Sequence, residues 1–497
     1  MPGTTSTMPG GPDAEVSPST PHPRRWIALA VIAISQLMVV LDATIVNIAL
    51  PQAQADLGIS NADRQWVVTA YTLTFGGLLL LGGRIADYWG RKRTFLVGMV
   101  GFAIASAIGG LATTGGMLFA ARALQGAFGA LLAPASLALL TVLFTQATER
   151  AKAFAVYGAI AGGGSAVGLL LGGVLTQYAD WRWCLLVNIP IAAVALFAAI
   201  PLVPESRAHG NTRYDVPGAV VVTAGLVSLV YGFTRAAEDG WDATATIGFI
   251  TAGVVLLAAF VVIEMRSSHP LLPLRILLDR NRGGSYLTST LVGAGLFGAF
   301  LFLTFYFQNS LGYTPLEAGL ASLPITLGVL IAAGVASQLM PRIGPKPLML
   351  AGTMLAAAAM LSLTRIDLDT SFLAHLLPAQ VLLGLGLGFT FVPLSSLALV
   401  GVPEHDAGAA SATLNATQQI GGSLGTALLN TFFTSAVTAY LASRVPNQAT
   451  AAQAQIEGYT VAFAWGAGLI LLAGVATLVL VKVRKDEIPS GGAVHVG

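Results

Sequence analysis

Long apolar runs recur along the whole chain, and they limit its possible folds more than any other feature. A membrane-spanning helix needs about 20 mostly apolar residues, and fourteen runs of that kind can be read between the charged residues. Only helices or closed barrels satisfy all backbone polar groups in lipid, and continuous runs lack the alternation of a barrel strand. The sequence therefore predicts an all-α membrane protein with fourteen transmembrane helices. They are expected near residues 26–48, 65–83, 94–112, 117–144, 153–176, 184–203, 216–235, 244–264, 285–307, 318–339, 347–364, 375–400, 409–435 and 460–482.

The charged residues are few and exclude several classes of function. They make up 10% of the chain, against about 25% in soluble domains, so a water-soluble globule is excluded. The net charge of +2 without a clustered basic face argues against a nucleic-acid partner. Cys184 is the single cysteine, which excludes an intrachain disulfide, and the six histidines are scattered. No metal and no cofactor are therefore expected.

The basic residues are unevenly divided between the two sets of alternate loops. Nineteen of the 25 Lys and Arg residues share the side of Arg24, which indicates the cytoplasmic side by the positive-inside rule. We therefore expect a multi-pass protein of the cell membrane with both termini in the cytoplasm. Residues 1–23 are rich in Pro, Gly, Ser and Thr and are predicted to form a disordered tail. Residues 483–497 are expected to form a second cytoplasmic tail.

An internal repeat divides the chain. The string PASLAL at residues 134–139 recurs as PLSSLAL at residues 393–399, and Gly90-Arg91-Lys92 recurs as Gly344-Pro345-Lys346. The pattern predicts two six-helix halves, residues 24–203 and 285–482, separated by a linker at 204–284 that carries two inserted transmembrane helices. Parallel halves of this kind are typical of secondary transporters that bind substrate between the halves near the midplane.

The loop after the second run carries a distinctive spacing. Residues 83–93 read GRIADYWGRKR, with Gly83, Asp87, Gly90 and Arg91 at fixed intervals. The string resembles the signature loop of the major facilitator superfamily, Gly-x-x-x-Asp-x-x-Gly-Arg-Lys/Arg, although Tyr88 replaces the Arg often found after the Asp. The resemblance implies the major facilitator fold and a conformational latch that holds the two halves in one alternating-access state.

Two charged residues interrupt apolar runs. Asp42 lies within LDATIVNIALP at residues 41–51, and Arg122 lies inside the fourth run. Intramembrane charges are costly and usually functional. The first string resembles the first-helix motif of the fourteen-helix drug/proton antiporters (EmrB/QacA type), and RALQGAFG at residues 122–129 resembles the fourth-helix Arg-x-x-x-Gly motif of the superfamily. These resemblances imply that Asp42 carries the proton and that Arg122 tunes it. An Asp that only caps a helix and an Arg that snorkels to the interface are the alternatives.

The fifth run is rich in glycine. Gly158, Gly168, Gly172 and Gly173 resemble the glycines of the antiporter motif Gly-x-x-x-Gly-Pro-x-x-x-Gly-Gly, but Leu169 stands where that motif has proline. Close helix packing alone would also explain these small residues.

An aromatic series occupies the ninth run. Residues 300–308 read FLFLTFYFQ, and Tyr306 and Gln308, together with Asn47 of the first run, are predicted to line a largely apolar substrate cavity. Lipid-facing aromatic rings are the alternative.

The sequence predicts a transporter rather than an enzyme. It contains no phosphate-binding loop, so an ion gradient must supply the energy. We expect a monomeric secondary transporter that exports small, largely apolar compounds of the drug or antibiotic type by proton antiport with alternating access. A proton-coupled nutrient or metabolite symporter and a non-transporting membrane receptor are the alternatives.

Overall fold

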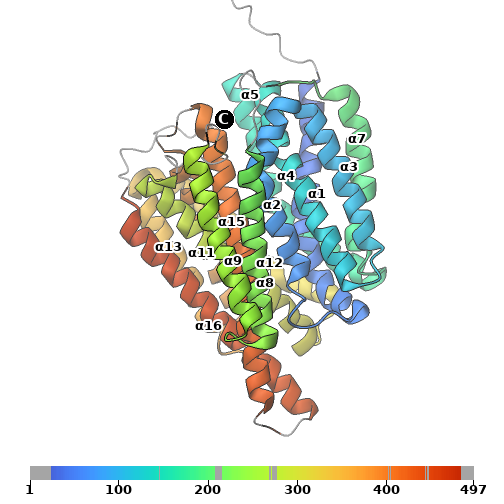
Figure 1. Ribbon diagram of the computed structural model, residues 1–497, viewed down its shortest axis with the longest axis vertical. Coiled ribbons are helices and arrows are strands. Elements are labelled where there is room, and N and C mark those ends of the chain that lie inside the picture. Colours follow the sequence, from blue (N-terminus) through green and yellow to red (C-terminus); the bar gives the residue numbers. More distant parts are fainter. Residues whose placement is uncertain are drawn as a thin grey trace, which may run out of the picture.

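A bundle of long helices makes up the described part of the chain (Figure 1). The computed structural model describes residues 24–482 apart from 145, 208–214, 268–269, 271–276, 401, 403, 443 and 445–446, and no strand occurs in that part. The first helices are α1 (Arg25–Leu57), α2 (Trp66–Trp89), α3 (Arg91–Gly110), α4 (Gly115–Leu143), α5 (Ala147–Tyr178), α6 (Trp183–Leu186), α7 (Asn188–Leu202), α8 (Val216–Asp239) and α9 (Thr244–Arg266). The all-α prediction is confirmed.

The remaining helices follow in a second series. They are α11 (Arg280–Phe305), the π-helical turn η1 (Tyr306–Ser310), α12 (Pro315–Ile343), α13 (Pro345–Leu363), the π-helical turn η2 (Phe372–Leu376), α14 (Leu377–Leu399), α15 (Glu404–Ala442) and α16 (Gln448–Leu480). Helices α1–α7 pack mainly among themselves and form the first bundle, and α11–α16 form the second bundle.

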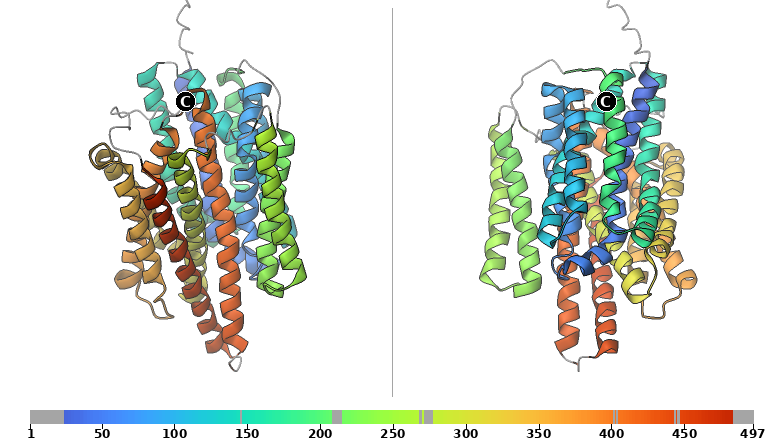
Figure 2. Two further views of the ribbon diagram at one scale, coloured as in Figure 1. Left: turned by 60° about the vertical axis from the view of Figure 1, so that its left-hand side comes forward. Right: turned by 90° about the vertical axis from the view of Figure 1, so that its right-hand side faces the viewer.

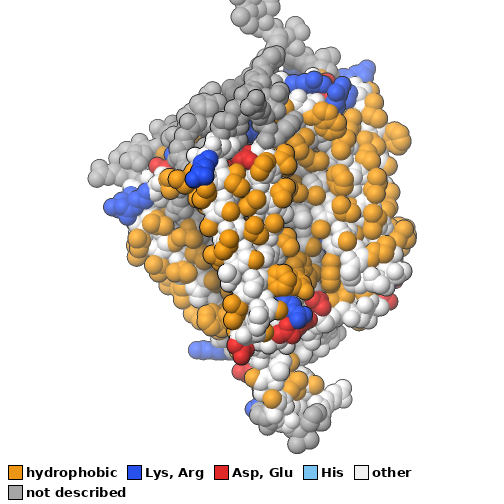
Figure 3. Space-filling model, in the orientation of Figure 1, with side chains coloured by type: hydrophobic (Ala, Val, Ile, Leu, Met, Phe, Trp, Pro, Cys, Tyr) orange, Lys and Arg blue, Asp and Glu red, His pale blue; other side chains and the backbone are white. Residues whose placement is uncertain are grey.

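Most of these helices have the length and composition of membrane spans. Thirteen described segments are long and apolar enough to cross a bilayer, with α6 and α7 counted as one segment. Helix α5, with 32 residues, packs against α1 and α12 as a further long helix of the bundle. Apolar side chains cover the middle of the face seen in Figure 3, while charged side chains gather toward its two ends. This surface matches a lipid environment.

The two ends of the molecule differ. Helix α1 begins and α16 ends at one end, which we call the termini face, and the hairpin of α15 and α16 extends beyond the other helices at the opposite end, the far face (Figures 1 and 2). The predicted run 460–482 placed the start of the last helix twelve residues too late, since α16 begins at Gln448. Helix formers rich in Ala and Gln extend it past the apolar window, and the Asn447 side chain caps it by accepting from the Thr450 N–H at 2.8 Å.

Helix α1 is also longer than its apolar run. It continues past residue 48 through Pro51 to Leu57. A proline lacks the N–H that would bond to the carbonyl four residues earlier, but membrane helices tolerate this when neighbours satisfy the backbone. Here the Ile48 carbonyl, next to the opened turn, accepts a hydrogen bond from Gln308 Nε2 at 2.8 Å.

The two inserted helices α8 and α9 form a pair on one flank of the molecule (Figure 2). Helix α8 contacts α2 of the first bundle and α15 of the second. Gln65 Nε2 donates to Thr234 Oγ1 at 2.7 Å, and Thr431 Oγ1 donates to the Phe233 carbonyl at 2.7 Å. Through α8 the insertion is therefore hydrogen-bonded to both bundles. Helix α9 packs on α8 and has few buried residues.

Side-chain hydrogen bonds join the two bundles toward the far face. In addition to the Gln308 bond to α1, Asn430 Nδ2 donates to the carbonyls of Asn61 and Ala62 at 2.9 and 3.1 Å. Gln177 Oε1 of α5 accepts from the Leu316 N–H of α12 at 3.3 Å. These bonds draw the bundles together at the far face.

Candidate functional site

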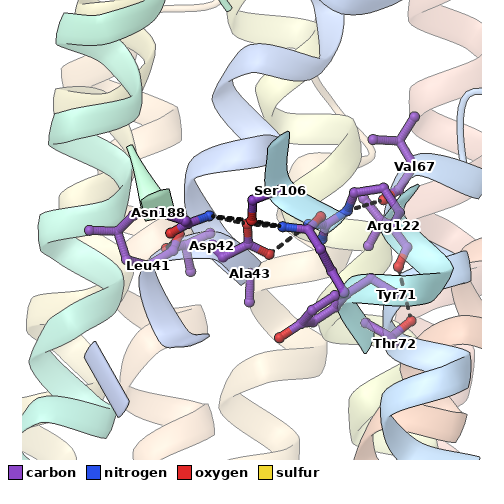
Figure 4. Close-up of polar contacts among 12 residues, drawn as sticks. Leu41, Asp42, Ala43, Val67, Tyr71, Thr72, Ser106, Arg122 and Asn188 are labelled. Carbon is purple, nitrogen blue, oxygen red and sulfur yellow. Dashed lines mark hydrogen bonds and ion pairs between the residues drawn. The ribbon is translucent and has the colours of Figure 1, made fainter. Parts of the chain in front are cut away.

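A buried ion pair lies at the centre of the first bundle. Arg122 Nη1 of α4 donates to Asp42 Oδ2 of α1 at 2.6 Å, and the two side chains are 2% and 0% exposed (Figure 4). Asp42 stands in the middle of α1 and not at its end. The helix-capping and snorkelling interpretations therefore do not describe this pair.

Two amides complete the surroundings of the carboxylate. Gln125 Nε2 and Asn188 Nδ2 donate to Asp42 Oδ1 at 2.9 and 2.7 Å. Ser106 of α3 accepts from the same amide nitrogens, at 2.6 Å from Gln125 and 3.3 Å from Asn188. Three hydrogen bonds, from Arg122, Gln125 and Asn188, therefore converge on the two carboxylate oxygens of Asp42.

Arg122 is held by partners besides Asp42. Its Nε donates to the Val67 carbonyl at 2.9 Å, and its Nη1 donates to Gln125 Oε1 at 2.8 Å. Its guanidinium carbon lies 4.4 Å from the centre of the Tyr71 ring, a cation–π distance. The arginine therefore has partners on α2 and α4 in addition to Asp42.

Sequence reasoning missed three members of this network. Gln125 follows Arg122 by one helical turn, so the i,i+3 spacing on one face was a usable signal. Asn188 is the first residue of α7, where a polar side chain is common at a helix start and gives no specific signal. Ser106 lies in an apolar run without any sequence signal, because only the tertiary packing of α3 brings it to the site.

The loop between α2 and α3 is tied to the end of α7. Gly90 has a φ of 124°, where a side chain is disfavoured, and Glu205 occupies the place of its missing Cβ. Asp87 Oδ1 lies 3.0 Å from Arg91 Nη2, and the Arg91 N–H donates to the Ser206 carbonyl at 2.9 Å. These contacts lie within the first bundle, and the latch between halves stays a prediction.

The structure distinguishes Gly83 of this loop motif from its neighbour Gly82, which precedes the motif. A Cβ on Gly83 would meet Pro134 Cβ at 3.6 Å, an ordinary contact. A Cβ on Gly82 would instead overlap the Ala130 carbonyl. The close approach of α2 to α4 therefore depends on Gly82, which the loop motif does not include.

The glycines of α5 serve two different contacts. Cβ atoms on Gly168 and Gly172 would meet α1, at the Leu41 carbonyl (3.1 Å) and the Ile45 carbonyl (3.0 Å). A Cβ on Gly173 would lie 2.7 Å from Leu316 Cα of α12, in the other bundle. Gly158 also lies in α5, but its packing falls outside the described side-chain positions. The glycine run thus lets α5 touch both α1 and α12.

The three residues predicted to line a substrate cavity make separate hydrogen bonds in the structure. Asn47 Nδ2 donates to the Ala43 carbonyl of its own helix at 3.3 Å. Tyr306 is buried, and its hydroxyl donates to the Asp367 carbonyl at 2.5 Å. Gln308 joins the bundles through Ile48. Their role toward a substrate stays a prediction.

Comparisons with known proteins place this chain among membrane transporters of one superfamily. The family model for the Major Facilitator Superfamily matches residues 32–426. The puromycin resistance protein pur8 of Streptomyces alboniger is 50% identical over 480 residues, covering 96% of this chain and 95% of that protein. The cephamycin export protein CmcT of Amycolatopsis lactamdurans is 38% identical and covers 94% and 95%. The crystal structure of a bacterial homologue of the human lysosomal transporter Spinster, inward-facing and unoccupied, matches with a TM-score of 0.64 at 14% identity, covering 94% and 98%.

Proposed function

This chain belongs to the major facilitator superfamily, and from that premise we propose that it exports small organic compounds across the cell membrane in exchange for protons. Relatives that match nearly the whole chain carry the names of an antibiotic resistance protein and an antibiotic export protein. Their names support export of the drug or antibiotic class. The direction of transport and the coupling ion are parts of the proposal.

The observation that carries the proton coupling is the buried Asp42–Arg122 pair. Charges are expensive in a membrane protein interior, and a carboxylate is a group that can exchange one charge for a proton. A proton on Asp42 would neutralise it and release Arg122 to Val67 and Gln125. The hold of α1 on α4 would then weaken, which links protonation to helix arrangement.

Alternating access supplies the rest of the cycle. The hydrogen bonds between the bundles lie toward the far face, which we propose to be the outer side, with both termini cytoplasmic. Antiport follows if Asp42 takes up a proton in the outward-open state and releases it after the switch to the inward-open state, and if the ionised form returns to the outward-open state carrying substrate. The proposed exporter works as a monomer and takes up protons from outside.

Transport into inverted membrane vesicles tests this proposal, with puromycin as the probe. Acidifying the vesicle interior should drive accumulation of the probe, and an ionophore that collapses the proton gradient should release it. A symporter would instead accumulate the probe in right-side-out vesicles under an inward proton gradient. A receptor would bind the probe without moving it.

The proposed topology predicts where the α8–α9 loop lies. With Cys184 replaced by Ala, an Asp239→Cys variant should react with an impermeant thiol reagent on intact cells. Native Cys184 is buried, so its background labelling is expected to be low. Labelling of Asp239→Cys only after cell lysis would contradict the outward placement of this loop.

The loop between α2 and α3 gives a second prediction. An Asp87→Asn change removes the partner of Arg91 and, as part of the proposed latch, should reduce export several-fold while the amount of protein in the membrane stays normal. Glu457→Gln is the control, because Glu457 is an exposed residue of α16 with no ion pair among the described residues. Equal export rates of the two variants at matched expression would remove the latch from the mechanism.

A further inference from the structure

An arginine of the first bundle is enclosed by aromatic rings of the second. Arg64, between α1 and α2, is 1% exposed, and its guanidinium carbon lies 4.1 Å from the centre of the Phe305 ring and 4.5 Å from that of Phe433. Phe302 is at 5.8 Å. Tyr459 of α16 packs on Phe302 and Phe433 and closes the set. We call Phe302, Phe305, Phe433 and Tyr459 the aromatic cage.

The guanidinium is buried in this cage without a counter-charge. Among the described residues Arg64 makes no ion pair, and its side-chain hydrogen bond is from Nε to Asn430 Oδ1 at 3.2 Å. Its Nη2 and the Tyr459 hydroxyl are buried, and neither has a partner of acceptable hydrogen-bond geometry. Burial lowers the pKa of Arg64 to about 10, opposed by the nearby Tyr459, so the group stays cationic at neutral pH. The rings therefore stabilise the guanidinium through cation–π contacts, in addition to its hydrogen bond to Asn430.

Arg64 and the aromatic cage belong to different bundles and meet at the interface between them. Phe302 and Phe305 belong to α11, Phe433 to α15 and Tyr459 to α16, whereas Arg64 is carried by the first bundle. Proposed alternating access separates the bundles at this end, which would withdraw Arg64 and leave the cage unoccupied. The rings would then face the pathway between the bundles.

A cavity lies beside this arrangement. It has a volume of about 630 Å³ at the far face and is lined by Asn61 and by Ser310 and Gln455, among others. Asn61 accepts from the same Asn430 that binds Arg64, at 2.9 Å. Ser310 ends the turn that continues α11 beyond Phe305. The cage is thus separated from the cavity by a few side chains.

We propose that the aromatic cage is a binding site for organic monocations near the outer exit, and that Arg64 is a tethered competitor for it. The proposal rests on the proposed function, because it needs the bundles to part at the far face. A substrate with an ammonium or guanidinium group and apolar substituents fits a site that stabilises charge with rings and offers no carboxylate. Closure returns Arg64 to the cage and displaces such a substrate outward.

Equilibrium binding to the purified protein tests this site separately from transport. The probe is benzyltrimethylammonium, and its uncharged isostere, in which carbon replaces the nitrogen, reports apolar binding alone. Removing the tethered cation in Arg64→Ala should tighten binding of the ammonium probe by about ten-fold or more, as a desolvated cation–π site allows. Binding of the isostere should change far less. Arg64→Lys retains a cation and should resemble the wild type.

Two further variants separate the cage from general loosening of the protein. Adding Phe305→Leu to Arg64→Ala should reverse the gain in affinity for the ammonium probe. Arg182→Ala is the matched control, since Arg182 lies over Trp181 within the first bundle at the same end of the molecule. Unchanged probe affinity in a folded Arg64→Ala protein, or a gain that Phe305→Leu does not reverse, overturns the proposal. Because binding is read without a gradient, failure of proton-driven export leaves this test intact.

Discussion

An Asp42→Asn variant is expected to lose gradient-driven export while still inserting in the membrane. Asparagine keeps the shape of the side chain but cannot exchange a proton, so substrate could equilibrate across vesicles but not be concentrated. Asp42→Glu keeps the carboxyl group and should retain part of the activity with a shifted pH profile. The measurement is proton release from reconstituted vesicles on addition of substrate.

Because Asp42 is half of a buried ion pair, Asp42→Asn also affects stability, and a double variant controls for that loss. Removing one partner of a buried pair costs about 3–5 kcal/mol, although Arg122 keeps Val67, Gln125 and Tyr71 as partners. The double variant Asp42→Asn/Arg122→Gln removes both charges and should restore the protein level without restoring coupling. Asp56→Asn, in the exposed end of the same helix, should export normally. Wild-type coupling in Asp42→Asn would place the proton carrier elsewhere.

A Gly319→Leu change is expected to prevent closure at the far face. A Cβ at Gly319 of α12 would lie 2.6 Å from the Leu169 carbonyl of α5, closer than real Cβ contacts, so the two helices would have to separate. Overpacking costs about 1–3 kcal/mol, which is enough to shift the equilibrium about five- to 150-fold away from the closed state. Export should fall accordingly, because the cycle requires both states.

The same helix supplies the control for this prediction. A Cβ on Gly334 of α12 would meet no atom within 4 Å, so Gly334→Leu should export like the wild type. Spin labels on Ala55→Cys and Ala452→Cys, across the far-face cavity, should report a longer distance in Gly319→Leu than in Gly334→Leu. An unchanged distance would mean that this contact does not control closure.

The fold could be predicted because its main determinant is local. Each apolar run carries its own signal for a membrane helix, and the charges between the runs mark their limits. The limits of α15 and α16 could not be predicted this way, because both helices are longer than their apolar runs. Helix α16, for example, begins with a segment rich in Ala and Gln that the Asn447 side chain caps. Helix propensity outside the membrane leaves no hydropathy signal.

The site could be predicted only where a residue breaks an apolar pattern. Asp42 and Arg122 do so, and the structure brings them together. A serine inside a helix, such as Ser106, and an asparagine at a helix start, such as Asn188, occur in many proteins and give no functional signal. Their role here depends on how α3 and α7 pack against α1. Arg64 lies in the short segment between two apolar runs, where a basic residue is common. Nothing near it in the sequence indicates the rings of α11, α15 and α16.

The position of helix α8 makes the two seams between the bundles unequal. Its hydrogen bonds to Gln65 and Thr431 cover the seam between α2 and α15, whereas α5 and α12 meet without an inserted helix between them. An apolar compound already dissolved in the bilayer would therefore find one lateral route obstructed by protein and the other bordered by lipid. We expect such compounds to reach the protein from the surrounding leaflet and to enter on the α5–α12 side only.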